Sequence, residues 1–167
     1  MAEGEEEVRI ARIIACFAPG SAGSPEAVAR LAAEMQAELL GLFIEDVELL
    51  RFAALPFAAE VGFPSAARRS VDLAGLERQL HAQAAGLRQA LATALDPTAV
   101  SWSFRVARAS PENAVEAALA EGYAPALIIP PRGNPRAERR VLRRPEISEQ
   151  ALRALLRSVQ PVLILPA

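Results

Sequence analysis

Short apolar runs and longer segments of helical periodicity alternate along most of this chain. Five short runs have the apolar or alternating character of β-strands, at residues 8–17, 39–45, 100–106, 126–129 and 162–165. Apolar runs of this length, bounded by turn residues, are typical of strands in a sheet that is covered on both faces. The segments between them carry apolar residues three or four positions apart, which indicates amphipathic helices.

Capping signals mark where these helices begin. Ser24 and Ser110 each precede a proline and then a glutamate. In this arrangement the serine caps the helix, the proline occupies its first turn, and the acid faces the positive end of the helix dipole. Asp72 is expected to cap a long helix that ends near Leu95, and a last helix is predicted over residues 147–159.

The alternation of strands and helices predicts an α/β fold. Strands joined through helices form a parallel sheet, and the helices then cover both of its faces. We expect an open five-stranded parallel sheet of the Rossmann-like type. The length and the even distribution of apolar segments predict a single domain over residues 1–167.

The stretch at residues 46–71, between the second strand and the second long helix, departs from this alternation. It is rich in apolar residues but is interrupted by proline and glycine, so we expect a partly helical insertion that packs against another part of the protein. Phe52, Phe57 and Phe63 are its candidate anchors, because aromatic side chains dominate such contacts. The insertion is interpreted either as a lid over the sheet edge or as a surface for an unidentified protein partner.

Composition excludes several kinds of chemistry. All 18 basic residues are arginine, so neither a P-loop lysine nor a Schiff-base lysine is available. One histidine, His81, and one cysteine, Cys16, allow neither a two-histidine metal site nor a disulfide within one chain. No nucleophile–base pair is recognisable, so we expect no enzyme, no catalytic residue and no metal, and slow ATP hydrolysis is the one activity that this leaves open.

The net charge of −2 gives the chain no general attraction to nucleic acid. No apolar run reaches the roughly 18 residues of a membrane helix, and no signal peptide opens the chain. We therefore expect a soluble cytoplasmic protein without membrane or nucleic-acid partners. Glutamates dominate residues 1–8, which we interpret as a disordered acidic tail.

The loop after the fourth predicted strand is strongly basic. Its arginines are Arg132, Arg136, Arg139, Arg140, Arg143 and Arg144. Guanidinium groups bind phosphate through paired hydrogen bonds, so the loop is a candidate site for a phosphate, a nucleotide or an acidic partner. The alternative is a solvated loop whose arginines pair with surface acids.

In four stretches this chain resembles the universal stress protein family. They are residues 13–17, 110–115, 126–133 and 160–165. The resemblance covers most of the chain from Ile10 to Pro166, apart from the insertion. It implies a Rossmann-like, adenine nucleotide alpha hydrolase-like fold with strand order 3-2-1-4-5. Many members of that family form dimers through the last strand, which implies a homodimer through Val162, Leu163, Ile164 and Leu165.

Members of that family that bind ATP carry a loop of the form G-x-x-G-x9-G-[ST] after the fourth strand. In this chain Pro130 stands at the first glycine, Gly133 matches the second, and Arg143 and Arg144 stand at the last two positions. Those members also place an aspartate at the end of the first strand, where this chain has Phe17.

The resemblance therefore implies a member with a degenerate nucleotide-binding motif. We expect a stress-related or regulatory interaction protein that forms dimers and does not bind ATP. The alternative is a sensor that holds ATP, AMP or phosphate through Phe17, Arg132, Gly133, Arg136, Arg143 and Arg144.

Overall fold

The structure is a computed structural model, which describes residues 10–20, 24–55, 59–61, 68–70, 72–121, 126–129 and 163–164. The strands are β1 (Arg12–Phe17), β2 (Glu38–Glu45), β3 (Ala59–Val61), β4 (Arg68–Ser70), β5 (Trp102–Arg108), β6 (Ala126–Ile129) and β7 (Leu163–Ile164). The helices are α1 (Pro25–Met35), α2 (Val47–Ala53), α3 (Leu73–Leu95) and α4 (Pro111–Ala120).

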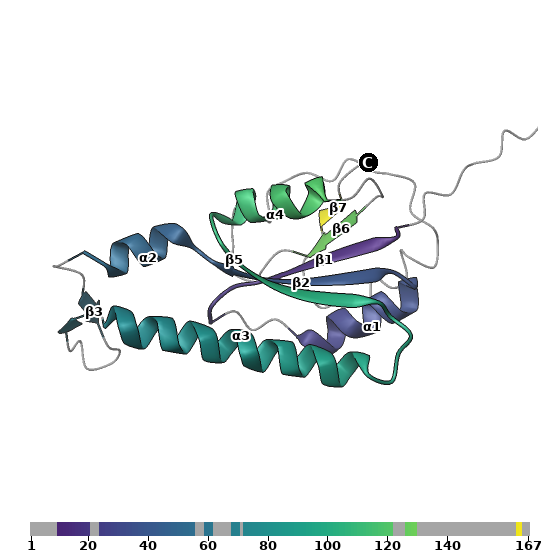
Figure 1. Cartoon of the computed structure of the whole chain (residues 1–167), viewed down its shortest axis with the longest axis horizontal. Coiled ribbons are helices and arrows are strands. Elements are labelled where there is room, and N and C mark those ends of the chain that lie inside the picture. The colour runs from purple at the N-terminus through teal and green to yellow at the C-terminus, as the bar shows by residue number, and fades with distance from the viewer. Residues whose placement is uncertain are drawn as a thin grey trace, which may run out of the picture.

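Four strands form a parallel sheet in the order β5-β2-β1-β6, as Figure 1 shows. Numbered as the predicted strands, this order is 3-2-1-4, so the parallel α/β arrangement is confirmed for these four strands. The central strand β1 is fully covered, and its residues from Ile13 to Phe17 are at most 3% exposed. Apolar runs without alternation mark β1, β2 and β6 because helices cover both faces of the sheet.

The predicted fifth parallel strand is not seen among the residues that the structure describes. The two residues of it that are described, Leu163 and Ile164, form β7, which pairs with β6 in the antiparallel direction. A parallel fifth strand requires a crossover that returns the chain to the opposite end of the sheet. The connecting residues 130–162, including the helix predicted over 147–159, lie outside the described residues.

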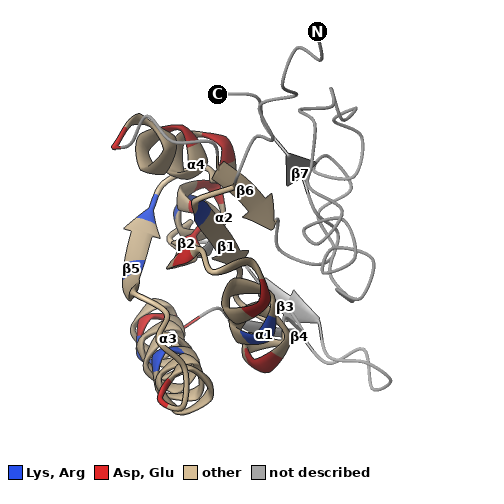
Figure 2. Ribbon diagram, turned by 90° about the vertical axis from the view of Figure 1, so that its right-hand side faces the viewer, with Lys and Arg blue, Asp and Glu red and all other residues tan. Residues whose placement is uncertain are grey.

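Helices lie on both faces of the sheet, as predicted. Figure 2 shows α1 and α3 on one face and α4 on the other. The face under α1 and α3 buries alternate strand residues such as Ile13, Phe17 and Phe43. The opposite face packs Ile14 and Cys16 against the small residues of α4.

The predicted serine caps are present. The Ser24 hydroxyl accepts a hydrogen bond from the backbone N–H of Ala27 (3.2 Å), and the Ser110 hydroxyl accepts one from Asn113 (3.3 Å). Asp72 occupies the N-cap position of α3, so the predicted start of this helix is confirmed. Its side chain makes no capping hydrogen bond, so the predicted capping interaction was wrong. Its carboxylate instead lies 3.8 Å from Arg78, one and a half turns into the helix.

The insertion is partly helical, as expected, but its apolar helix is only partly packed. Leu50 of α2 packs against the core under α3, whereas Leu49, Phe52 and Leu55 are 47%, 53% and 41% exposed. The rest of the insertion contains an unpredicted antiparallel pair, β3 with β4. Figure 1 shows α2 extending beyond the end of β2, away from the sheet. Phe57 and Phe63 lie outside the described residues.

Candidate functional site

The carboxyl ends of the parallel strands form the candidate edge for ligands. In open α/β sheets, ligands bind beyond these ends, near the strand where the direction of the strand order reverses. In this sheet that strand is β1, which lies between β2 and β6. Its last residue, Phe17, is therefore at the position where the fold itself favours a site.

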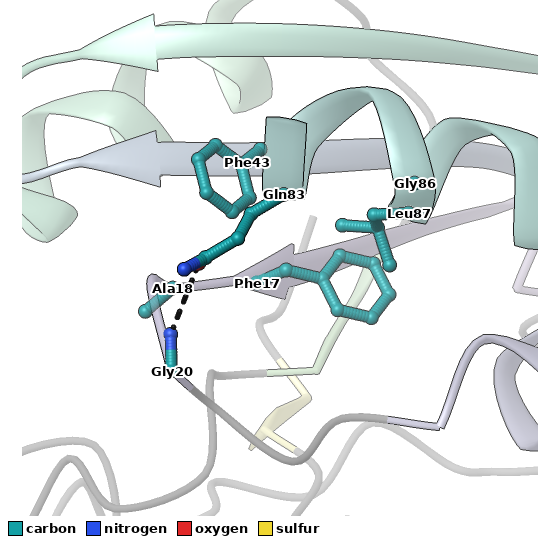
Figure 3. Close-up of a pocket in the computed structure, with 7 residues that line it drawn as sticks. All are labelled: Phe17, Ala18, Gly20, Phe43, Gln83, Gly86 and Leu87. Carbon is teal, nitrogen blue, oxygen red and sulfur yellow. Dashed lines mark hydrogen bonds between the residues drawn. The ribbon is translucent and has the colours of Figure 1, made fainter. Parts of the chain in front are cut away.

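A depression opens at this edge, and we call it the edge pocket. Its volume is about 360 Å³, and Figure 3 shows its lining, which is Phe17, Ala18, Gly20, Phe43, Gln83, Gly86 and Leu87. Phe17 and Phe43 are register partners on neighbouring strands, and both belong to the core beneath α3. The pocket thus has two aromatic rings from the sheet and one wall from the middle of α3.

A short turn after β1 closes one side of the edge pocket. Pro19 is followed by Gly20, whose φ of +70° lies in the left-handed region that favours glycine. The backbone N–H of Gly20 donates a hydrogen bond to Gln83 Oε1 (3.3 Å), which Figure 3 draws as a dashed line. Gln83 therefore ties the turn after the central strand to helix α3.

An ion-pair cluster lies at the same edge, at the ends of β2 and β5. Glu45 is 4% exposed and is the one buried charged residue among those described. Arg108 Nε donates to Glu45 Oε2 (3.0 Å), and Arg108 Nη1 lies 3.6 Å from Glu77 Oε1 on α3. Asp46 caps α2 by accepting from the N–H of Glu48 (2.9 Å). These acids therefore have local partners.

Cys16 and His81, the single cysteine and the single histidine of the chain, both lie among the described residues. Burial raises the pKa of the Cys16 thiol to about 12, so the thiol stays protonated and unreactive at neutral pH. His81 is exposed, and its Nδ1 donates to the carbonyl oxygen of Glu77 (3.3 Å). Within the described ranges no three His, Cys, Asp or Glu side chains are grouped as a metal site requires, and no helix could cross a membrane.

The structure places only some of the predicted site residues. Phe17 lies at the end of β1 and in the edge pocket, as its position in the sequence indicated. Arg132, Gly133, Arg136, Arg143 and Arg144 lie outside the described residues, so the anion site in that loop stays a prediction. Val162 and Leu165 of the predicted dimer strand also lie outside the described residues. The two described residues of that strand form β7, which lies beside β6 at the end of the strand order.

Sequence reasoning missed the contribution of α3 to the edge pocket. Gln83, Gly86 and Leu87 line it, although only the leucine stripe of this helix was recognised. A glycine in the interior of a long helix was the available signal, because glycine lowers helix stability and its presence there calls for a reason.

The fold and the edge pocket together define an open-sheet α/β protein with a small, mainly apolar depression at the ends of its central strands. No protein-family model matches the chain, and none of the curated proteins matches it. The relation to the universal stress proteins accordingly stays a prediction that rests on the sequence stretches given above.

Proposed function

We propose that this protein is a universal-stress-protein-like interaction protein that forms homodimers, takes part in regulation under stress and does not bind ATP. The observation that carries the proposal is the end of β1. Phe17 is 3% exposed there and packs in the core beneath α3. A phenylalanine offers no hydrogen-bonding group to a ribose or an adenine, whereas recognition of such polar groups depends on a few well-placed donors and acceptors.

The other described groups of the edge support the same proposal. The Glu45 carboxylate is paired with Arg108 and is almost fully buried, so it is not presented to a nucleoside. The described lining of the edge pocket contains no arginine that could meet a phosphate. In the sequence, Pro130 replaces a glycine in the loop after β6, and proline lacks the backbone N–H that a phosphate cradle uses.

Titration calorimetry with ATP and AMP tests the proposal. We expect no saturable heat at nucleotide concentrations up to about 1 mM, which limits any affinity to weaker than about −4 kcal/mol. Inorganic phosphate serves as the control ligand for the basic loop. Saturable ATP binding that falls with salt and is lost in an Arg136→Ala, Arg143→Ala double variant would instead favour the nucleotide or phosphate sensor.

The homodimer is tested independently by light scattering during size-exclusion chromatography. We expect a mass twice that of one chain, because an apolar strand at the edge of a sheet is stabilised when a symmetric partner covers it. A mass of one chain at micromolar concentration contradicts the dimer. That result does not bear on ATP binding, which titration calorimetry tests separately.

A further inference from the structure

Strand β5 ends the sheet on the side opposite to β6. Among the described residues it pairs only with β2, and it stands first in the strand order. Figure 2 shows β5 at the outer edge of the sheet, between the layers of α3 and α4. The strand has seven residues and contains neither proline nor glycine. Its own sequence therefore does nothing to prevent a further strand from pairing with it.

Every second residue of β5 directs its backbone groups away from the sheet. The N–H of Leu39 donates to the carbonyl oxygen of Ser101 (3.0 Å), and the N–H of Ala109 donates to that of Glu45 (3.2 Å). The odd-numbered residues therefore bond to β2, because the backbone groups of successive strand residues point to opposite sides. The even-numbered residues offer their N–H and C=O groups on the outer edge. They are Trp102, Phe104, Val106 and Arg108.

The side chains of these four residues share the face of the sheet that α3 covers. Trp102 and Phe104 pack partly against the core beneath α3, and Arg108 reaches Glu77 on that helix. Val106 stands between them in the row and is 46% exposed. A second strand beside β5 would cover part of this valine and continue the apolar row.

The charged side chains of β5 do not guard its edge. Natural edge strands often carry unpaired charges, because these repel a second strand. In β5 both arginines are held by carboxylates of the same chain. Arg105 Nη2 donates to Glu121 Oε2 (2.7 Å), and Arg108 Nε donates to Glu45 Oε2 (3.0 Å). An approaching strand therefore meets ion pairs and not uncompensated cations.

The sequence of β5 is suited to pairing with a copy of itself. In a symmetric dimer each contact occurs twice about a two-fold axis. When two β5 strands run antiparallel with the axis at Arg105, Phe104 of one copy lies opposite Val106 of the other. Pairs of an aromatic and a β-branched residue stabilise antiparallel strands. In the same alignment Trp102 lies opposite Arg108, which is a favourable pair of an aromatic ring and a cation.

The axis itself would bring together two ion pairs. Arg105 stands opposite Arg105 of the second copy in this alignment, and two uncompensated arginines there would repel each other. Each is bound by Glu121 through two hydrogen bonds, so each pair carries no net charge. The side chains of Arg105 and Glu121 are 44% and 46% exposed, so the carboxylate of one copy can face the guanidinium of the other. This charge complementarity makes a second copy of the chain the partner that fits the edge.

We propose that β5 pairs antiparallel with β5 of a second copy and so joins two sheets edge to edge. In β5 only Val106 is a large apolar side chain that is exposed, so the contact buries little apolar area. Small contacts of this kind are weak, and we expect a dissociation constant of about 0.1 mM. The proposal goes beyond the proposed homodimer, which uses the opposite end of the strand order. Two different self-contacts would let dimers associate into larger assemblies.

Hydrogen exchange at single backbone amides, followed by NMR on the full-length chain, tests the contact. The amides of Phe104, Val106 and Arg108 point to the outer edge and become hydrogen-bonded only when a second strand is present. They are expected to exchange about threefold more slowly at about 1 mM protein than at about 30 µM. A dimer through the opposite end of the sheet leaves these amides open, so it does not produce this change.

Val106→Lys is expected to abolish the dependence on concentration. Lysine is a common guard residue of natural edge strands, and the exposed position of Val106 allows the change without loss of the fold. Val106→Thr is the control for shape, because it keeps a β-branched side chain of similar size. Ala85→Lys is the control for charge, at an exposed position of α3. Both controls are expected to retain the threefold effect.

Two cysteine variants test the alignment of the strands. Ser103 of one copy lies opposite Ala107 of the other, with about 4.5 Å between their α-carbons, which a disulfide can span. In oxidised glutathione, a mixture of the Ser103→Cys and Ala107→Cys proteins is expected to form covalent dimers. Either variant alone places its two cysteines four residues apart, about 13 Å, and is expected to form none. Cys16 is 2% exposed and does not compete.

Three results overturn the proposal. They are amides at the outer edge whose exchange does not change with concentration, a Val106→Lys protein that keeps the change, and a cysteine mixture that cross-links no better than either variant alone. Strong protection of these amides at both concentrations also overturns it, because the same chain then covers the edge. Calorimetry with ATP and the mass at micromolar concentration test the proposed function independently of these measurements.

Discussion

Phe17→Asp is expected to lower the free energy of unfolding by about 5 kcal/mol or more. Loss of a buried phenylalanine costs about 3–5 kcal/mol, and a buried carboxylate without a partner adds a further penalty. Phe17 is 3% exposed and packs beside Phe43 in the core beneath α3, so water cannot readily solvate the new charge. Small domains are stable by only about 5–15 kcal/mol, so this single change removes much of the stability.

Urea denaturation followed by circular dichroism measures this effect, with Phe17→Leu as the control. Leucine keeps an apolar side chain at the end of β1, and we expect a loss of only about 1–2 kcal/mol. The comparison separates the loss of volume from the burial of charge. A Phe17→Asp protein that unfolds within about 1 kcal/mol of the parent would contradict the interpretation of Phe17 as core, because a tolerated carboxylate must be solvated or paired.

This result bears on the function as well as on stability. The ATP-binding members of the family that the sequence resembles carry an aspartate at this position. Because Phe17 is part of the core, a single change to aspartate is expected to destabilise the protein without creating a nucleotide site. The edge of β1 would then differ from a nucleotide site through its whole packing environment, which supports a role that does not depend on ATP.

The parts of the fold that sequence predicted are those governed by local patterns. The apolar runs of β1, β2 and β6 and the serine caps at Ser24 and Ser110 depend on residues close together in the chain. The pairing of β3 with β4 was missed because strands of three residues are too short to show a period of two. The direction of β7 could not be read either, because an apolar run has no sign that distinguishes parallel from antiparallel pairing.

The candidate site was predictable only in part for a similar reason. Phe17 could be placed because the end of a buried strand in an α/β fold is a ligand position. The contributions of Gln83 and Gly86 depend on which turn of α3 lies over that strand end. Both residues are far from Phe17 in sequence, and the leucine stripe of α3 fixes the buried face of the helix but not its position along the sheet.

Arg108→Ala is expected to lower the free energy of unfolding by about 2–3 kcal/mol. Removing one partner of a buried ion pair costs about 3–5 kcal/mol because the other charge is left uncompensated, and the half-exposed position of Arg108 reduces that penalty. The Glu45 side chain is only 5% exposed and loses the donor at 3.0 Å, while Glu77 on α3 loses a guanidinium group 3.6 Å away. Both carboxylates then remain near each other at the ends of β2 and α3.

Arg105→Ala is a matched control on the same strand. Arg105 makes a two-pronged ion pair with Glu121, whose pKa is lowered mainly by the hydrogen bond from Arg105. Both partners are largely exposed, so water replaces much of that interaction. The loss for Arg105→Ala is therefore expected to be a small fraction of the loss for Arg108→Ala.

A double-mutant cycle with Glu45→Gln shows whether the uncompensated carboxylate is the cause. In the Arg108→Ala background, Glu45→Gln is expected to recover more than half of the lost stability, since the neutral amide removes the buried charge. Equal losses for Arg105→Ala and Arg108→Ala, or no recovery in the double variant, would contradict this account.

The cluster also joins β2 and β5 to α3, and Glu77 precedes Gln83 by six residues, roughly 9 Å along the helix. We therefore expect Arg108→Ala to weaken the bond between Gln83 and Gly20, seen as faster hydrogen exchange at the Gly20 amide.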